Sequence, residues 1–502
     1  MKDQLKLGVL LSYLSTLISI ISQLVYMPIM IKLLGKSEYG LYTLVSSVVS
    51  YLSLFSLGFT GAYVRFYSRL RNDRTQLASL NGLFILLFMF LSILAVVCGL
   101  TLCSFPKLVF GTKLTEFELE KAQMMMLILV LNIGFTLLSS VFSSIINAHE
   151  QFVFLRIVGI VSSIANPFIC LPLLLMGYRS LMLVIVTTAI TISSFVLNLW
   201  YCLSNLRIPI SFRQIKWTLL KEISIFSLFL LINMIIDQIN WNIDKLILGH
   251  TSGTDEIAVY GVASQFNTLF MMFSTTISSV FVPRVNRVVA EQRTDSYKVL
   301  SDLMAKIGRI QWMIMSFISI GFIVFGKYFI VNVFAGRGYE ASYITTLLLV
   351  IPAVIPLIQN IGIEIQRAMN MHQFRSVVYL LISIVNVCIS IPLAQKWGAV
   401  GAASGTAVSL IVGNGIIMNL FYHHVMHLDM NYFWKEILKT WKGLFIPVLF
   451  GIMIMKVIEF SSIGIYLLCI VVFSIVYCVS IYRFSCNDYE RHLIRHLVKK
   501  ND

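Results

Sequence analysis

Long apolar stretches recur along almost the whole chain, and they limit what it can fold into more than any other feature. A helix needs roughly 20 predominantly apolar residues to cross the hydrocarbon core of a membrane. Such stretches lie near residues 8–33, 40–64, 79–104, 122–146, 152–176, 180–203, 222–248, 257–283, 309–334, 342–366, 374–395, 399–425, 443–459 and 462–483. We therefore predict an all-α integral membrane protein with about fourteen transmembrane helices.

The composition also indicates a membrane protein. Of the 502 residues, 58% are hydrophobic and 12% are charged, whereas soluble domains carry roughly 25% charged residues. The first apolar stretch is long enough to span and has no small-residue cleavage site, so we interpret it as a retained helix and not as a signal peptide. The eight cysteines show no CxxC spacing, and we interpret them as small apolar residues.

The basic residues predict the orientation of the chain. Lys and Arg concentrate in the cytoplasmic segments between membrane helices, and most of the 38 Lys and Arg residues fall on that side if both termini are cytoplasmic. The net charge of +15 is spread over many of these segments, where it faces anionic lipid headgroups. We therefore expect membrane lipid, and no nucleic acid, as a partner of these charges.

An internal repeat of about 220 residues divides the chain. The matches pair Ser163, Ile164, Asn166, Pro172 and Leu173 with Ser383, Ile384, Asn386, Pro392 and Leu393, and Tyr39-Gly40 with Tyr260-Gly261. Each copy covers six predicted helices, and an even number preserves orientation, so the halves should be related by an axis along the membrane normal. We predict pseudo-symmetric six-helix bundles over residues 1–216 and 217–427, and two appended helices with a cytoplasmic tail over residues 428–502.

Two segments resemble a known family. The first is LGKSEYGLY, from Leu34 to Tyr42, and the second is NIDKLILG, from Asn242 to Gly249, with Val259-Tyr260-Gly261-Val262-Ala263 following it. Both are similar to segments of the bacterial polysaccharide and O-antigen flippases. These flippases belong to the multidrug/oligosaccharidyl-lipid/polysaccharide exporter superfamily, which also contains the multidrug and toxic compound extruders (MATE) and the lipid II flippases.

The resemblance implies a fold and a function. The fold would be MATE-like, with bundles that alternate between inward-open and outward-open states and with helices 1, 2, 7 and 8 lining the cavity. The substrate would be an oligosaccharide repeat unit on undecaprenyl pyrophosphate. It would be carried from the cytoplasmic to the outer leaflet of the bacterial inner membrane for O-antigen, capsule or exopolysaccharide assembly, with a polysaccharide polymerase and a chain-length regulator as protein partners.

Polar residues on the predicted lining helices suit such a cavity, because sugar hydroxyls need hydrogen-bonding partners when they leave water. The candidates for contact with substrate are Gln23 on the first predicted helix, Gln265 on the eighth, and Asn233, Asp237 and Asn240 on the seventh. The seventh helix also carries Asp244, and its four polar residues recur at spacings of three and four, which place them on one face. Alternatively, these side chains hold neighbouring helices together.

The acids within predicted membrane helices are candidates for binding a coupling H⁺ or Na⁺, since an intramembrane acid is by default a functional candidate. They are Asp237, Asp244 and Glu364. Asp237 and Asp244 have an alternative interpretation as partners of Lys245. For Glu364, an ion pair with Arg367, three residues later, is the favoured interpretation.

Two arginines end the second and eighth predicted helices at equivalent places. Arg65 and Arg284 are candidates for gripping the diphosphate of the substrate, because a guanidinium donates paired hydrogen bonds to phosphate. Alternatively, both residues are ordinary cytoplasmic anchors.

The sequence contains no GxxxxGK[ST] phosphate loop and no HExxH motif. We therefore expect a transporter and not an enzyme, with no cofactor and no metal site. A lipid II-type flippase and a multidrug/cation antiporter of the same fold remain as alternatives. A membrane glycosyltransferase or O-antigen polymerase is disfavoured, because the longest predicted outside loop, near residues 105–121, is too short for a catalytic domain.

Overall fold

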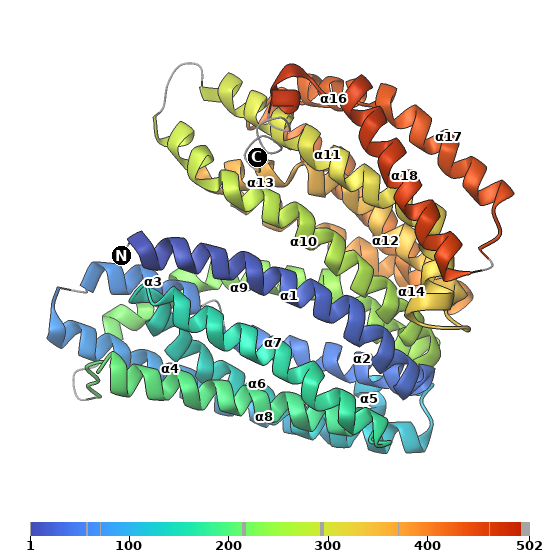
Figure 1. Ribbon diagram of the computed structural model, residues 1–502. Helices are drawn as coiled ribbons and strands as arrows, with labels where there is room; N and C mark the ends of the chain where they lie inside the picture. The colour runs from blue at the N-terminus through green and yellow to red at the C-terminus, as the bar shows by residue number, and fades with distance from the viewer. Residues whose placement is uncertain are drawn as a thin grey trace. The chain divides into compact units, whose positions relative to one another are not determined.

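The computed structural model describes residues 2–56, 59–70, 72–212, 217–291, 296–369, 371–460 and 462–492. Every regular element in these ranges is helical, and they contain no strand. The chain divides into two compact units, Met1–Gly261 and Val262–Asp502, which are described separately (Figure 1). The predicted all-α membrane fold is confirmed.

The number of membrane spans differs from the prediction. Within the described residues, 11 helices are long and apolar enough to cross a membrane, or 12 if the bent pair Met430–Lys439 and Trp441–Val457 is one span. The count of about fourteen is therefore not confirmed. The predicted stretches 374–395 and 399–425 meet at a kink where Trp397 and Gly398 leave helical geometry, and Gln373–His424 is counted as one span across that kink.

The first unit is built around helix α6. Its elements are α1 (Lys2–Leu34), α2 (Lys36–Leu52), η1 (Ser53–Ser56), α3 (Phe59–Leu70), α4 (Arg74–Cys103), α5 (Pro106–Phe110), α6 (Glu116–Ala148), α7 (Phe152–Leu175), α8 (Ser180–Trp200), η2 (Tyr201–Asn205), α9 (Trp217–Thr251) and the first turns of α10 (Thr254–Ala290). Helix α6 contacts α2, α3, α4 and α8. Small residues permit the close approach, and the Ser92 hydroxyl on α4 donates to the carbonyl of Gly134 on α6 at 2.9 Å.

The boundary between the compact units lies beyond the predicted domain boundary at residues 216 and 217. Helix α9 packs against α2 and α3, which groups it with the first unit, and the boundary falls after Gly261, inside α10. The predicted boundary follows the sequence repeat, which assigns α9 and α10 to the second half. The compact units are defined by contacts between helices, whereas the predicted domains are defined by the sequence repeat. The three predicted domains therefore stay a prediction.

The repeat is visible in a pair of matched polar contacts. Asn166 and Asn386 each donate to a threonine on the next helical segment, at 3.1 and 3.4 Å, and accept from a thiol or hydroxyl one turn away, at 3.6 and 3.0 Å. The members are Cys170, Asn166 and Thr187 in the first unit and Ser390, Asn386 and Thr406 in the second. Because each lies about 220 residues from its counterpart, the two halves share this interior contact.

The second unit contains the rest of α10 and eight further α-helices within its described residues. They are α11 (Ser296–Tyr328), α12 (Glu340–Ile358), α13 (Asn360–Ala368), α14 (His372–Leu410), α15 (Met418–His424), α16 (Met430–Lys439), α17 (Trp441–Val457) and α18 (Ile463–Phe484), with π-helical segments η3 (Phe329–Phe334) and η4 (Ile411–Ile417). The predicted stretch 342–366 is broken, because Gln359 leaves helical geometry and ends α12. Residues 360–366 therefore belong to the short helix α13.

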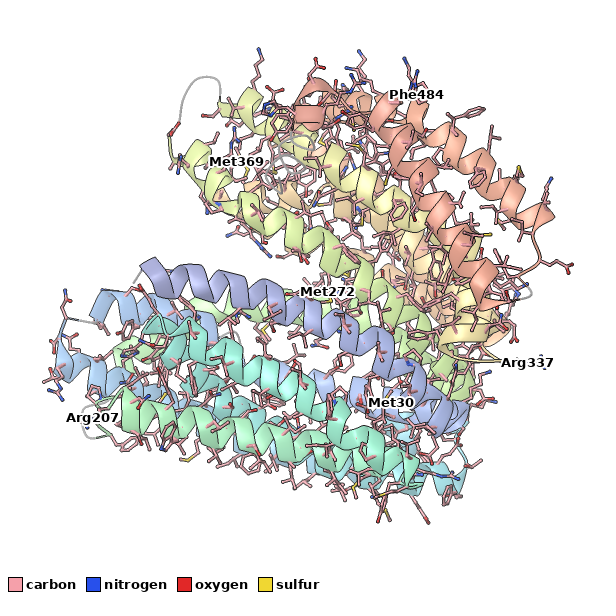
Figure 2. The ribbon with its side chains drawn as sticks, viewed as in Figure 1. Met30, Arg207, Met272, Arg337, Met369 and Phe484 are labelled. Carbon is pink, nitrogen blue, oxygen red and sulfur yellow. The ribbon has the colours of Figure 1, made fainter. Side chains whose placement is uncertain are left out.

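A buried charge cluster fastens the last helices to α11. Arg309 on α11 is 3% exposed, and its Nε and Nη2 donate to the two carboxylate oxygens of Glu490 at 2.7 and 3.0 Å. Its Nη1 lies 3.3 Å from a carboxylate oxygen of Glu436 on α16, and its Nη2 also donates to the carbonyl of Ser485 at 2.8 Å. Ser485 follows Phe484, which Figure 2 labels at the end of α18. One guanidinium thus joins α11, α16 and the segment after α18.

Replacing Arg309 should destabilise the second unit strongly. Arg309→Ala leaves Glu490 buried without its charged partner, and breaking a buried ion pair in this way costs about 3–5 kcal/mol. The free energy of unfolding, or Tm in detergent, measures the loss. Arg367→Ala is the matched control, because Arg367 is exposed and pairs with Glu364 near solvent, where a pair contributes about 0–1 kcal/mol. Equal effects of the two substitutions would contradict a structural role for the Arg309 cluster.

Candidate functional site

The predicted site residues lie in both compact units. Those in the first unit are Gln23 on α1, Arg65 on α3, and Asn233, Asp237, Asn240 and Asp244 on α9; those in the second are Gln265 and Arg284 on α10 and Glu364 on α13. The side chains of Asn233 and Asp237 lie outside the part of the chain that the structure describes. The substrate and ion roles assigned to all of these residues stay predictions.

A seam of polar side chains joins α9 to α2 and the turn η1 that follows it. Gln238 on α9 accepts from the Ser50 hydroxyl at 3.3 Å and donates to the Ser53 hydroxyl at 3.4 Å. One turn further along α9, the Asn242 amide donates to Gln238 at 2.7 Å. These uncharged groups are half-buried, and amides and hydroxyls of this kind can exchange their mutual hydrogen bonds for bonds to sugar hydroxyls.

Asp244 is buried beside this seam. Its carboxylate is 1% exposed, and the Tyr260 hydroxyl on α10 donates to it at 2.5 Å. The ammonium of the neighbouring Lys245 interacts electrostatically with the same carboxylate. The structure thus brings together the predicted partners Asp244 and Lys245 and adds Tyr260 from another helix.

The hydrogen bond from Tyr260 should contribute measurably to stability. Tyr260→Phe removes the donor while keeping the ring, and a hydrogen bond to a charged group is worth about 1.5–3 kcal/mol. We expect a loss of that size in the free energy of unfolding. Tyr178→Phe is the control, because the Tyr178 ring is 51% exposed. A Tyr260→Phe variant as stable as the control would show that the carboxylate finds an equivalent partner without this hydroxyl.

An apolar groove lies between α1 and α7. It has a volume of about 550 Å³ and is lined on α1 by Ile21 and Val25 and on α7 by Pro167 and Phe168, among others. Near it, the Gln23 amide on α1 donates to the Ser19 hydroxyl at 3.1 Å. The groove can accommodate hydrocarbon but has little polar surface for a sugar. It is therefore a less suitable sugar site than the seam between α2 and α9.

The two arginine candidates and Glu364 have contacts other than those of the seam. Arg65 on α3 and Arg284 on α10 are both exposed, and they belong to different compact units. Arg367 pairs with Glu364 at 2.8 Å, as expected from their spacing. Glu364 lies on α13 and not within the spanning helix α12 as predicted, so its placement changes from inside a span to a short helix beyond one.

Two glutamates at the starts of helices were not predicted as site residues. Glu38 on α2 pairs with Lys121 on α6, lies 3.6 Å from Arg179, and accepts from the Ser180 hydroxyl on α8 at 2.5 Å. Glu118 on α6 accepts from hydroxyls on α2 and α10. The sequence signal for Glu118 is the spacing Thr115-x-x-Glu118, which is typical of a capping box and is confirmed at the start of α6.

The described residues contain no group of three or more His, Cys, Asp or Glu side chains placed to hold a metal ion. Their chemistry is that of hydrogen bonding and of paired charges. What the arrangement can do is bind polar groups reversibly within a largely apolar helical protein.

Solved structures of transporters share this fold. The chain is similar to a structure of the lipid II flippase MurJ in an inward closed conformation, with a TM-score of 0.74 and 18% identity, over 97% of this chain and 100% of the other. It is also similar to an inward-facing multidrug resistance transporter of the MATE family in the MOP superfamily, with a TM-score of 0.64 and 11% identity, over 83% and 95%. These similarities show the fold of a multi-pass membrane protein.

The sequence comparisons identify the family. The model for the family described as polysaccharide biosynthesis protein matches residues 5–289, more than half of the chain. The chain therefore belongs to that family, and the resemblance noted in its sequence is confirmed. A relative from Shigella flexneri, described as a putative O-antigen transporter, is 20% identical over 389 residues, which are 76% of this chain and 88% of the relative.

Proposed function

We propose that this protein is a flippase that moves undecaprenyl-pyrophosphate-linked oligosaccharide repeat units from the cytoplasmic to the outer leaflet by alternating access. The observation that carries the proposal is the family match over residues 5–289. The O-antigen transporter relative supports the same class of substrate. The product would serve O-antigen, capsule or exopolysaccharide assembly, and the protein would act as a transporter without catalysing a reaction.

The polar seam between α2 and α9 supports passage of a glycan. Taking unpaired hydroxyls into an apolar interior is costly, and a route lined by amides and hydroxyls offers replacement partners. Gln238, Ser50 and Ser53 provide both donors and acceptors in the first unit. Gln23, Asn233, Asn240 and Gln265 stay the further proposed contacts for the sugar. The hydrocarbon tail would remain in the membrane, outside the polar route.

The proposed setting is the bacterial inner membrane with both termini in the cytoplasm. The bias of Lys and Arg toward one set of segments supports this orientation. Membrane lipid surrounds the helices, and a polysaccharide polymerase and a chain-length regulator are the proposed protein partners, because they would receive the flipped repeat units.

The flippase proposal makes a direct prediction for cells. Deleting the gene, in a strain without a paralogue, should trap the lipid-linked repeat units on the cytoplasmic leaflet and abolish the surface glycan. Surface glycan measured by electrophoresis, together with leaflet-selective labelling of the lipid-linked intermediate, tests this expectation. Restoring the gene should restore the surface glycan. A normal surface glycan in the deletion strain would rule out this function.

Arg65 and Arg284 are the proposed contacts for the diphosphate. Both side chains are exposed at helix positions that are equivalent in the repeat, and a hydrogen bond to a charged group is worth about 1.5–3 kcal/mol. The double substitution Arg65→Gln and Arg284→Gln should therefore lower the flipping rate at least about tenfold in proteoliposomes at equal protein levels. Arg69→Gln with Arg287→Gln is the matched control, one turn further along each helix. Full activity of the variant with Arg65→Gln and Arg284→Gln would show that both arginines are cytoplasmic anchors and do not bind the diphosphate.

An ion gradient is the proposed source of energy. The membrane potential offers about 2.3 kcal/mol per charge per 100 mV, and H⁺ or Na⁺ would bind at Asp237, Asp244 or Glu364. Burial of Asp244 beside Lys245 supports it most directly, whereas Glu364 has a solvent-exposed partner, Arg367. Flipping rates that are equal with and without imposed H⁺ and Na⁺ gradients would exclude such coupling.

A lipid II-type flippase is the second candidate, because the structural similarity to MurJ extends over 97% of this chain. Lipid II also carries a glycan on a polyprenyl diphosphate, so the same seam and arginines would serve it. Loss of cell-wall synthesis, with an intact surface glycan, would distinguish this function. A multidrug/cation antiporter of the same fold would instead change drug susceptibility and leave both glycans intact.

A further inference from the structure

The first turns of α2, α6 and α10 meet at one end of the first unit. This end faces outward in the proposed orientation, and it lies near Met30 in Figure 2, opposite the end marked by Arg207. We call it the outer end. Here the carboxylate of Glu118 on α6 accepts from the Ser37 hydroxyl on α2 at 2.7 Å and from the Thr254 hydroxyl on α10 at 2.8 Å. The two hydroxyls are 3.3 Å apart.

One turn deeper, α2 and α10 touch through glycines. A Cβ atom on Gly40 would lie 1.9 Å from the carbonyl oxygen of Thr254, so no side chain fits between the two backbones. A Cβ atom on Gly261 would lie 3.2 Å from both Tyr39 and Thr43 on α2. Tyr39-Gly40 and Tyr260-Gly261 are equivalent in the 220-residue repeat. The contact is therefore made by matching positions of two equivalent helices.

This contact is of a kind that can open and reclose. Ser37 is exposed and Glu118 is half-buried, so water can replace the hydroxyl partners of the carboxylate when the helices separate. Where α2 and α10 meet at glycine, no side chains interlock, so none has to be separated when the two helices move apart. Glu38, next to Ser37, has a different environment, because it is buried and paired with Lys121 within the first six helices. Separating that pair would expose a buried carboxylate without its countercharge.

We propose that Ser37, Glu118 and Thr254 form a latch that closes the outer end between α2 and α10, and that it opens each time the glycan headgroup is released. Glu38, Lys121 and Ser180 act instead as a permanent brace among α2, α6 and α8. The proposal rests on the proposed function, since it assigns the latch to the step that follows passage of the sugar. Helix α10 contributes two turns to the first unit and continues into the second, so opening the latch releases one end of a helix that both units share.

A reversible crosslink tests whether the latch must open. In a background with the eight native cysteines replaced, Ser37→Cys with Thr254→Cys places two thiols where the hydroxyls are 3.3 Å apart, a separation compatible with a disulfide. Ser162→Cys with Ser194→Cys is the matched control, because those hydroxyls are 3.1 Å apart and lie on α7 and α8, both within the predicted first bundle of residues 1–216. Oxidation should lower the flipping rate of lipid-linked oligosaccharide at least tenfold in the latch pair only, and reductant should restore it.

Three outcomes decide the question. Continued flipping with the latch pair oxidised would overturn the proposal, because the contact would then be a fixed joint. Equal inhibition in the control pair would also overturn it, since any crosslink within the first unit would then stop the protein. If neither the parent protein nor the reduced variants move lipid-linked oligosaccharide, the proposed function is wrong. The latch then needs a test that does not depend on transport of a substrate.

Labelling of Thr43→Cys by a membrane-impermeant thiol reagent provides that measurement. Thr43 is half-buried beside Gly261, so an open latch should admit the reagent. Gly40→Ala prevents closure, because its Cβ would overlap the Thr254 carbonyl, and it should raise the labelling rate of Thr43→Cys at least fivefold. Gly159→Ala is the control, because no atom lies within 4 Å of the added carbon. Unchanged labelling in Gly40→Ala would overturn the latch independently of any transport assay.

Discussion

The interior of this protein depends on the absence of water around its helices. In a membrane, a polar group away from water must find its partner within the protein, and several of the described contacts find it on another helix. The Asn166–Thr187 contact, the Gln238 seam and the Arg309 cluster join different elements, and the Asn386–Thr406 contact joins the two parts of α14 on either side of its kink. They use either neutral groups or charges that offset one another. The apolar residues determine that helices form, and these polar contacts determine which helices pair.

Hydrophobicity predicted the fold class and the approximate positions of most helices, because the length of an apolar run is set by membrane thickness. It also separated the stretches 374–395 and 399–425 where Trp397 and Gly398 leave helical geometry. It did not predict that Gln359 ends α12 inside the predicted stretch 342–366. One residue that leaves helical geometry changes the average hydropathy of a long stretch very little.

The candidate site was predicted in part. Helical spacing predicted an ion pair for Glu364 with Arg367, three residues later, and direct adjacency in the sequence predicted Lys245 as a partner of Asp244. Neither identified Tyr260 as the hydrogen-bond donor to Asp244, or Gln238 as the centre of a seam with α2. Those contacts depend on which helices become neighbours. The 220-residue repeat showed that α2 and α10 are equivalent, but their crossing required the structure.

Helix α10 carries both the proposed diphosphate contact, Arg284, and one member of the latch, Thr254. It has 37 residues, and at 1.5 Å per residue it is about 55 Å long. Thr254 is its first residue and contacts Glu118, whereas Arg284 lies near its other end, after Pro283. A diphosphate held by Arg284 would thus act on the same helix whose first turn is held by the latch. A rigid helix can transmit strain between a diphosphate contact at one end and the latch at the other without a chain of intermediate side chains, because moving one end alters the geometry at the other.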